Sequence, residues 1–177
     1  PNVNVRAASC RGGQRHGRSA VPSRVASLIA MDLRLPAAGE TRERQVGLLN
    51  HLVDGTDVFV QTDREFEPIV ERELRHVAAV DYADGDPPPM SDPERRQWWR
   101  LQQVWALLRR HEREIDHRYE FVFKLRTDLD ITGAARLTDI YSQSIRPSRA
   151  PASAYLLADR LVGAAPSVME RIACLLY

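Results

Sequence analysis

The sequence predicts an α/β fold, with a mostly parallel sheet and helices on both of its faces. Short apolar runs recur along the chain, as expected for strands that are covered on both faces. Between them lie segments whose apolar residues repeat at three- and four-residue steps, which is typical of amphipathic helices. Strands and helices that alternate in this way indicate parallel pairing. The length of 177 residues fits one domain of this kind.

The expected elements of the first half alternate in order: a strand over 25–31, a helix over 41–53, a strand over 57–61, a helix over 66–77 and a strand over 77–80. The run from Val25 to Met31 is almost continuously apolar. Apolar residues at positions 46, 49 and 53 fall on one helical face, and Gly55 ends that helix. The second strand leads directly into Thr62 and Asp63.

The second half continues the alternation with a long helix from 92–94 to 115, a strand over 119–125, a short helix over 134–145, an extended stretch over 154–162 and a helix over 166–177. On the long helix, Trp98 and Trp105 recur with leucines at helical spacing, and we interpret both as core residues. The stretch 154–162 is interrupted by Asp159 and Arg160.

The first 24 residues contain glycines, serines and five arginines at 6, 11, 15, 18 and 24, with no acidic residue. Such a segment buries too little apolar surface to offset the entropy lost on ordering. We therefore expect a disordered, arginine-rich leader over 1–24 and a single domain over 25–177. A phosphate-binding arm and an organellar transit peptide are alternative interpretations of the leader.

Composition narrows the class of protein. A hydrophobic share of 44% and a charged share of 28% are ordinary for a globular chain. The net charge of +1 argues against a nucleic-acid binder, which usually has a basic excess. No apolar run approaches the roughly 20 residues that span a bilayer, so we expect no transmembrane segment. Two cysteines make no disulfide framework, and the expected location is the cytoplasm.

Two carboxylates, Asp128 and Asp130, follow the strand over 119–125. Ligands of open α/β sheets bind where strands end, and residues two apart on an extended segment point the same way. Paired carboxylates suit a hard cation such as Mg²⁺ or Mn²⁺. Arg126 lies two residues before Asp128, so its side chain would point the same way, and an arginine can bind a phosphate bidentately. A solvated turn in which Asp130 caps the next segment is the alternative interpretation.

Three stretches of the sequence carry a recognisable pattern. The first comprises Gln102–Trp105, Glu112 and Tyr119–Asp130. The second is the expected strand 54–63, which ends in Thr62 and Asp63, and the third is Asp159–Gly163 with Met169. Together they resemble a group of GT-A-fold glycosyltransferase-like proteins. In that group a glutamine-bearing helix precedes Tyr-Asp, three apolar residues and Arg-x-Arg-x-Asp. Because such proteins generally continue further, the resemblance also implies a relative that is truncated at its C-terminus.

The resemblance implies that the chain binds a nucleotide-sugar donor and transfers its sugar to an acceptor, which is a glycan, a lipid or a small molecule. Asp128 and Asp130 would hold a divalent cation, Mn²⁺ or Mg²⁺. Arg126 would add positive charge beside the departing diphosphate. Arg34 and Asp63 would lie near the base and the ribose.

Two other functions stay open. Asp128 to Thr132 matches the Asp-x-Asp-x-Thr motif of haloacid-dehalogenase-like phosphatases, in which the first aspartate is the nucleophile. The same α/β domain could also bind a nucleotide or a partner and catalyse nothing.

Overall fold

The computed structural model describes residues 25–30, 41–83, 93–127, 135–145, 155–157 and 161–174. The strands in this part of the chain are β1 (Val25–Ala30), β2 (Asp57–Asp63), β3 (Val77–Ala83), β4 (Phe121–Leu125), β5 (Tyr155–Leu157) and β6 (Leu161–Ala164). The helices are α1 (Arg42–Leu52), α2 (Glu67–Arg72), α3 (Pro93–Glu114), α4 (Leu137–Ile140) and α5 (Pro166–Cys174), with a 3₁₀ turn at Arg64–Phe66 and a π-helical turn at Tyr141–Ile145. The predicted leader over 1–24 lies outside the described residues.

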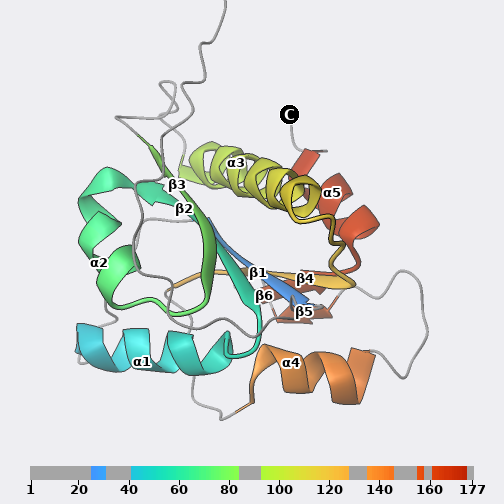
Figure 1. Cartoon of the computed structure of the whole chain (residues 1–177), viewed down its shortest axis with the longest axis horizontal. Helices are drawn as coiled ribbons and strands as arrows, with labels where there is room; N and C mark the ends of the chain where they lie inside the picture. Colours follow the sequence, from blue (N-terminus) through green and yellow to red (C-terminus); the bar gives the residue numbers. More distant parts are fainter. Residues whose placement is uncertain are drawn as a thin grey trace, which may run out of the picture.

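The strands form one sheet in the order β3-β2-β1-β4-β6-β5 (Figure 1). β1 pairs in parallel with both β2 and β4, and β2 pairs in parallel with β3. β6 is antiparallel to β4 and to β5. The predicted α/β fold with a mostly parallel sheet is therefore confirmed. The stretch 154–162, predicted as one extended segment, contributes to two antiparallel strands, and Asp159 and Arg160 between them lie outside the described residues.

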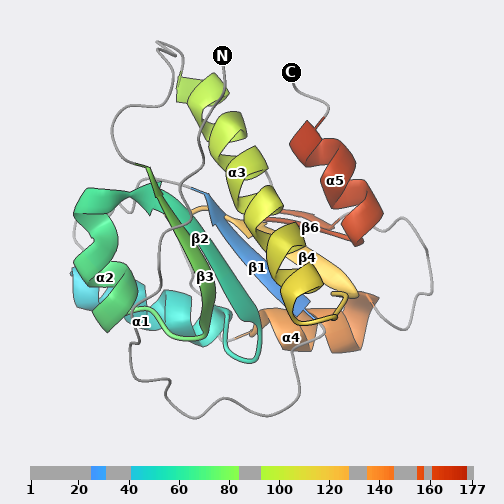
Figure 2. The same ribbon diagram turned by 45° about the horizontal axis from the view of Figure 1, so that its top comes forward.

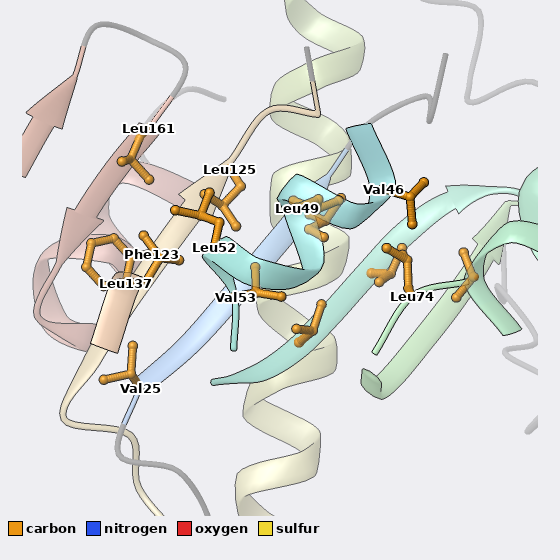
Figure 3. Close-up of a cluster of buried hydrophobic side chains, with 14 of the residues drawn as sticks. Val25, Val46, Leu49, Leu52, Val53, Leu74, Phe123, Leu125, Leu137 and Leu161 are labelled. Atoms are coloured by element: carbon orange, nitrogen blue, oxygen red, sulfur yellow. The ribbon is translucent and has the colours of Figure 1, made fainter. Parts of the chain in front are cut away.

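Helices cover both faces of the sheet, as predicted (Figures 1 and 2). Side chains of α1, α2 and α4 pack on one face, where Val46, Leu49, Leu74, Leu137 and Phe123 belong to one apolar cluster (Figure 3). We call it the α1 face. Leu101, Val104, Trp105 and Leu108 of α3 pack on the other face with Met169 of α5. We call this second face the α3 face.

Alternation along β2 assigns each of its residues to one of these layers. Val58 and Val60 belong to the α1 face, and Phe59 belongs to the α3 face. Because side chains alternate along a strand, Gln61 and Asp63 continue the α3 face and Thr62 the α1 face. The end of β2 therefore presents polar side chains to both layers.

The helix predicted over 66–77 is shorter in the structure, since α2 ends at Arg72 and β3 begins at Val77. Asn50 of α1 holds the connection: its side chain donates to the carbonyl of Glu73 and accepts from the backbone N–H of Arg75, both at 2.8 Å. His76 completes the reversal with φ +60°. Leu74 has helical spacing in the sequence but is buried from this turn instead.

Candidate functional site

The carboxyl ends of β1, β2, β3 and β4 lie together, because these strands are parallel. This region is called here the carboxyl end of the sheet, and the opposite side is the amino end. α1 and α3 both begin at the carboxyl end, since each follows a strand and returns toward the start of the next one. Open α/β sheets bind their ligands in such a place.

On the α3 face, a buried arginine joins two polar residues of β2. The Nη2 atom of Arg100 donates to both carboxylate oxygens of Asp63, each at 2.8 Å, and Nη1 lies 3.4 Å from Oε1 of Gln61. The Arg100 side chain is only 3% exposed, whereas that of Asp63 is 28% exposed. The guanidinium of Arg100 is therefore buried on the inner side of the ion pair, and the carboxylate of Asp63 is partly exposed to solvent.

Two more basic residues belong to β4 and its end. Lys124 is buried, with Nζ 5.6 Å from the centre of the Trp98 ring. Trp98 packs against the apolar cluster of the α3 face, as predicted for a core residue. Arg126 follows β4 directly and is half-buried. The carboxyl end therefore combines the cationic side chains of Arg100, Lys124 and Arg126.

On the α1 face, polar groups line the same end of the sheet. Nε2 of Gln45, in the first turn of α1, donates to the carbonyl of Thr127 at 2.8 Å. Thr62 and Tyr82 occupy paired positions on β2 and β3. Burial, followed by the charges of Glu71 and Glu67, raises the pKa of Tyr82 from 10.0 to about 12.

Some of these buried polar groups have unused hydrogen-bonding capacity. Among the described residues, the buried side-chain atoms without a hydrogen-bond partner include Oε1 of Gln45, Nε2 of Gln61, Oγ1 of Thr62 and the hydroxyl of Tyr82. All four belong to the carboxyl end of the sheet. Buried polar atoms are satisfied in the large majority of cases, so this concentration marks a place where a polar ligand completes the hydrogen bonds.

The amino end of the sheet shows the opposite behaviour. The Thr56 hydroxyl donates to the carbonyl of Val53 and lies 2.8 Å from the hydroxyl of Ser27. The buried carboxylate of Glu112 accepts from Arg109, from Arg118 and from the backbone N–H of Tyr119. Buried polar residues at this end are therefore satisfied within the chain, and they connect elements.

A shallow pocket of about 240 Å³ lies near the amino end and is lined by Gly47, Asn50, His51, Asp54, Arg75 and His76. Asp54 is engaged there by Nε2 of His76 at 3.2 Å and by Nη1 of Arg136 at 3.1 Å. The pocket is distant from the carboxyl ends of the strands, and two of its polar residues, Asp54 and His76, already bond to each other. We therefore place the candidate site at the carboxyl end instead.

The predicted site residues divide into two groups. Asp63 and Arg126 are both at the carboxyl end of the sheet, and Asp63 is bound to Arg100. Arg34, Asp128 and Asp130 lie outside the described residues. Within the described ranges, no group of three His, Cys, Asp or Glu side chains could hold a metal ion.

The sequence did not single out Arg100, Gln61 or Gln45. A signal for Arg100 was present, because it lies one helical turn before Val104 and a basic residue there falls on the buried face of the helix. Gln61 is a polar residue at the end of a strand covered on both faces, which is also unusual. The contact of Gln45 with Thr127 joins distant segments and has no local signal.

Comparison with protein-family models gave no match, and no curated protein matched the chain. In the described part of the chain, none of the helices has the length and apolar character needed to cross a membrane.

Proposed function

We propose that this chain is a glycosyltransferase-like domain that binds a nucleotide-sugar donor at the carboxyl end of its sheet. The observation that carries the proposal is the set of buried polar atoms with unused hydrogen-bonding capacity at that end. A nucleotide sugar has many hydroxyl, carbonyl and phosphate groups to pair with such atoms, whereas an apolar ligand would leave them unsatisfied at a cost of about 1–3 kcal/mol each.

The charges of the site suit the same class of ligand. Arg126 directly follows β4, where it can add positive charge beside the diphosphate. Asp63 is partly exposed and accepts from a hydroxyl or N–H group of the nucleotide. Arg34, at the predicted end of the first strand segment, is assigned to the same nucleotide on the strength of the sequence resemblance.

The proposed cation, Mn²⁺ or Mg²⁺, would be held by Asp128 and Asp130, which follow Arg126 and Thr127 in the sequence. Carboxylate oxygens are the ligands that these cations prefer. Both oxygens of Asp63 accept from Arg100, so Asp63 suits nucleotide binding better than metal binding. A bound cation supplies Lewis-acid stabilisation of the departing nucleoside diphosphate.

Thermal unfolding with a panel of nucleoside diphosphates, with and without Mn²⁺, tests the proposal. A ligand at about 100 times its Kd stabilises the folded state by about 2.7 kcal/mol, which raises the Tm by several degrees. We expect such a rise with at least one nucleotide, larger with Mn²⁺. Asp63→Asn and the double variant Asp128→Ala/Asp130→Ala should reduce it, and the exposed control Glu114→Ala should not.

Release of nucleoside diphosphate from a panel of nucleotide sugars distinguishes transfer from binding alone. Turnover that requires Mn²⁺ and is lost in the double aspartate variant supports a transferase. Binding without turnover leaves the non-catalytic nucleotide-binding alternative, and no thermal shift with any nucleotide contradicts the proposal itself.

A further inference from the structure

The contact of Arg100 with β2 goes beyond a simple ion pair. One guanidinium group engages two residues that are adjacent on the same face of the strand, Gln61 and Asp63. Oε1 of Gln61 is the amide atom that faces Arg100, at the long end of hydrogen-bond distances. The Nε2 donor of Gln61 is then turned away from Arg100, and it has no hydrogen-bond partner among the described residues.

This arrangement is a poor choice for stability alone. Burying an arginine removes it from water at a cost that its ion pair only partly repays, and apolar replacements of buried pairs are often neutral or stabilising. Leu101 and Val104 beside it show that α3 packs on the sheet through apolar side chains. Apolar packing alone therefore does not account for a charged residue at position 100.

We propose that Arg100 is a positioning residue that holds the Asp63 carboxylate and the Gln61 amide in the orientation that binds the ligand. Arg100 is covered by protein and acts through these two side chains, whereas Asp63 is open to solvent on one side. Asp63 supplies an acceptor that is partly open to solvent, and Nε2 of Gln61, two positions earlier on the same face, is a fully buried donor without a partner among the described residues. The inference rests on the proposed function only for the identity of the ligand.

A ligand-free measurement tests the positioning itself. In a ¹H–¹⁵N spectrum, the side-chain amide of Gln61, assigned with Gln61→Glu, should give one sharp pair of signals in the wild type. Arg100→Met should shift or broaden this pair. Arg100→Lys should change it less, because lysine keeps the charge, but some change should remain, because lysine lacks the planar guanidinium. Arg110→Met, at an exposed position of the same helix, should leave it unchanged.

A double-mutant cycle tests the consequence for binding, with the nucleoside diphosphate that gives the largest thermal shift in the presence of Mn²⁺. Arg100→Met should weaken its binding by about tenfold, as expected for a misplaced charged hydrogen-bonding group. The variant Asp63→Asn/Arg100→Met should bind no more weakly than Asp63→Asn alone, because Arg100 acts through Asp63. Arg100→Lys should recover part of the loss.

The outcomes separate the two proposals. If no nucleotide binds the wild-type chain, the proposed function fails and the amide signals still decide the role of Arg100. Unchanged Gln61 signals in folded Arg100→Met would overturn the positioning role. Additive losses in the cycle would also overturn it, since they would show that Arg100 and Asp63 act independently.

Discussion

Two glycines, Gly47 and Gly163, differ in the space that a methyl group would find. A Cβ at Gly47 on α1 meets nothing within 4 Å, whereas one at Gly163 on β6 would lie 2.5 Å from Cε1 of Phe123 and 2.8 Å from Cε1 of Phe121. Gly47→Ala should raise the free energy of unfolding by about 0.5–1 kcal/mol through helix propensity. Gly163→Ala should lower it by about 1–3 kcal/mol, because the two rings must move. Urea denaturation measures both, and a stabilising Gly163→Ala would contradict the packing described here.

Tyr82 gives the chain a distinct response to alkaline pH. Burial is the main cause that raises its pKa from 10.0 to about 12. Because the folded chain keeps the phenol neutral above the unfolded pKa, its stabilising contribution is complete below about pH 10 and is lost as the pH rises through 12. We expect a loss of about 1 kcal/mol, after allowance for the solvent that reaches part of the side chain. Tyr82→Phe should lack this loss, and absorbance of the phenolate should show one late-titrating tyrosine fewer in Tyr82→Phe than in the wild type.

At the scale of elements, the order of strands and helices up to β4 could be predicted from the sequence, because apolar runs and amphipathic patterns alternate there, whereas the interrupted stretch 154–162 was predicted as one segment and contributes to two strands. The end of α2 could not, since Leu74 keeps helical spacing although the Asn50 side chain binds the turn that ends the helix. A long-range hydrogen bond of this kind leaves no periodicity. The antiparallel pairing of β6 with β4 could not be predicted from local periodicity either, because the direction of a strand in a sheet depends on tertiary contacts.

The candidate site was predictable to a similar degree. The end of a strand marked Arg126, because ligands of open α/β sheets bind at strand ends, whereas Asp63 was expected near the nucleotide from the sequence resemblance. Arg100 approaches Asp63 from a helix 37 positions away, and only the fold brings them together. Residues that orient others across layers are therefore the part of a site that one sequence reveals least.

Over the whole part of the molecule that the structure describes, buried polar groups are satisfied at the amino end of the sheet and have unused hydrogen-bonding capacity at the carboxyl end. Two buried threonines, Thr56 and Thr62, represent these ends: the Thr56 hydroxyl bonds to Val53 and Ser27, and the Thr62 hydroxyl has no partner among the described residues. Replacing a satisfied hydroxyl leaves its partners unpaired, whereas replacing an unsatisfied one removes a desolvation cost. The same change should therefore have opposite effects at the two positions.

Thr56→Val should lower the free energy of unfolding by about 1–3 kcal/mol, and Thr62→Val should leave it unchanged or raise it by about 1 kcal/mol. Thr62→Val should also weaken nucleoside diphosphate binding, because a group kept for a ligand stabilises only the complex. Denaturation curves and titration calorimetry on the two variants measure both effects. If Thr62→Val destabilises the free chain as much as Thr56→Val does, the Thr62 hydroxyl stabilises the fold. The proposed difference between the two ends of the sheet is then contradicted. If instead stability rises while affinity falls, the carboxyl end carries polar groups at the expense of stability, as expected of a binding site.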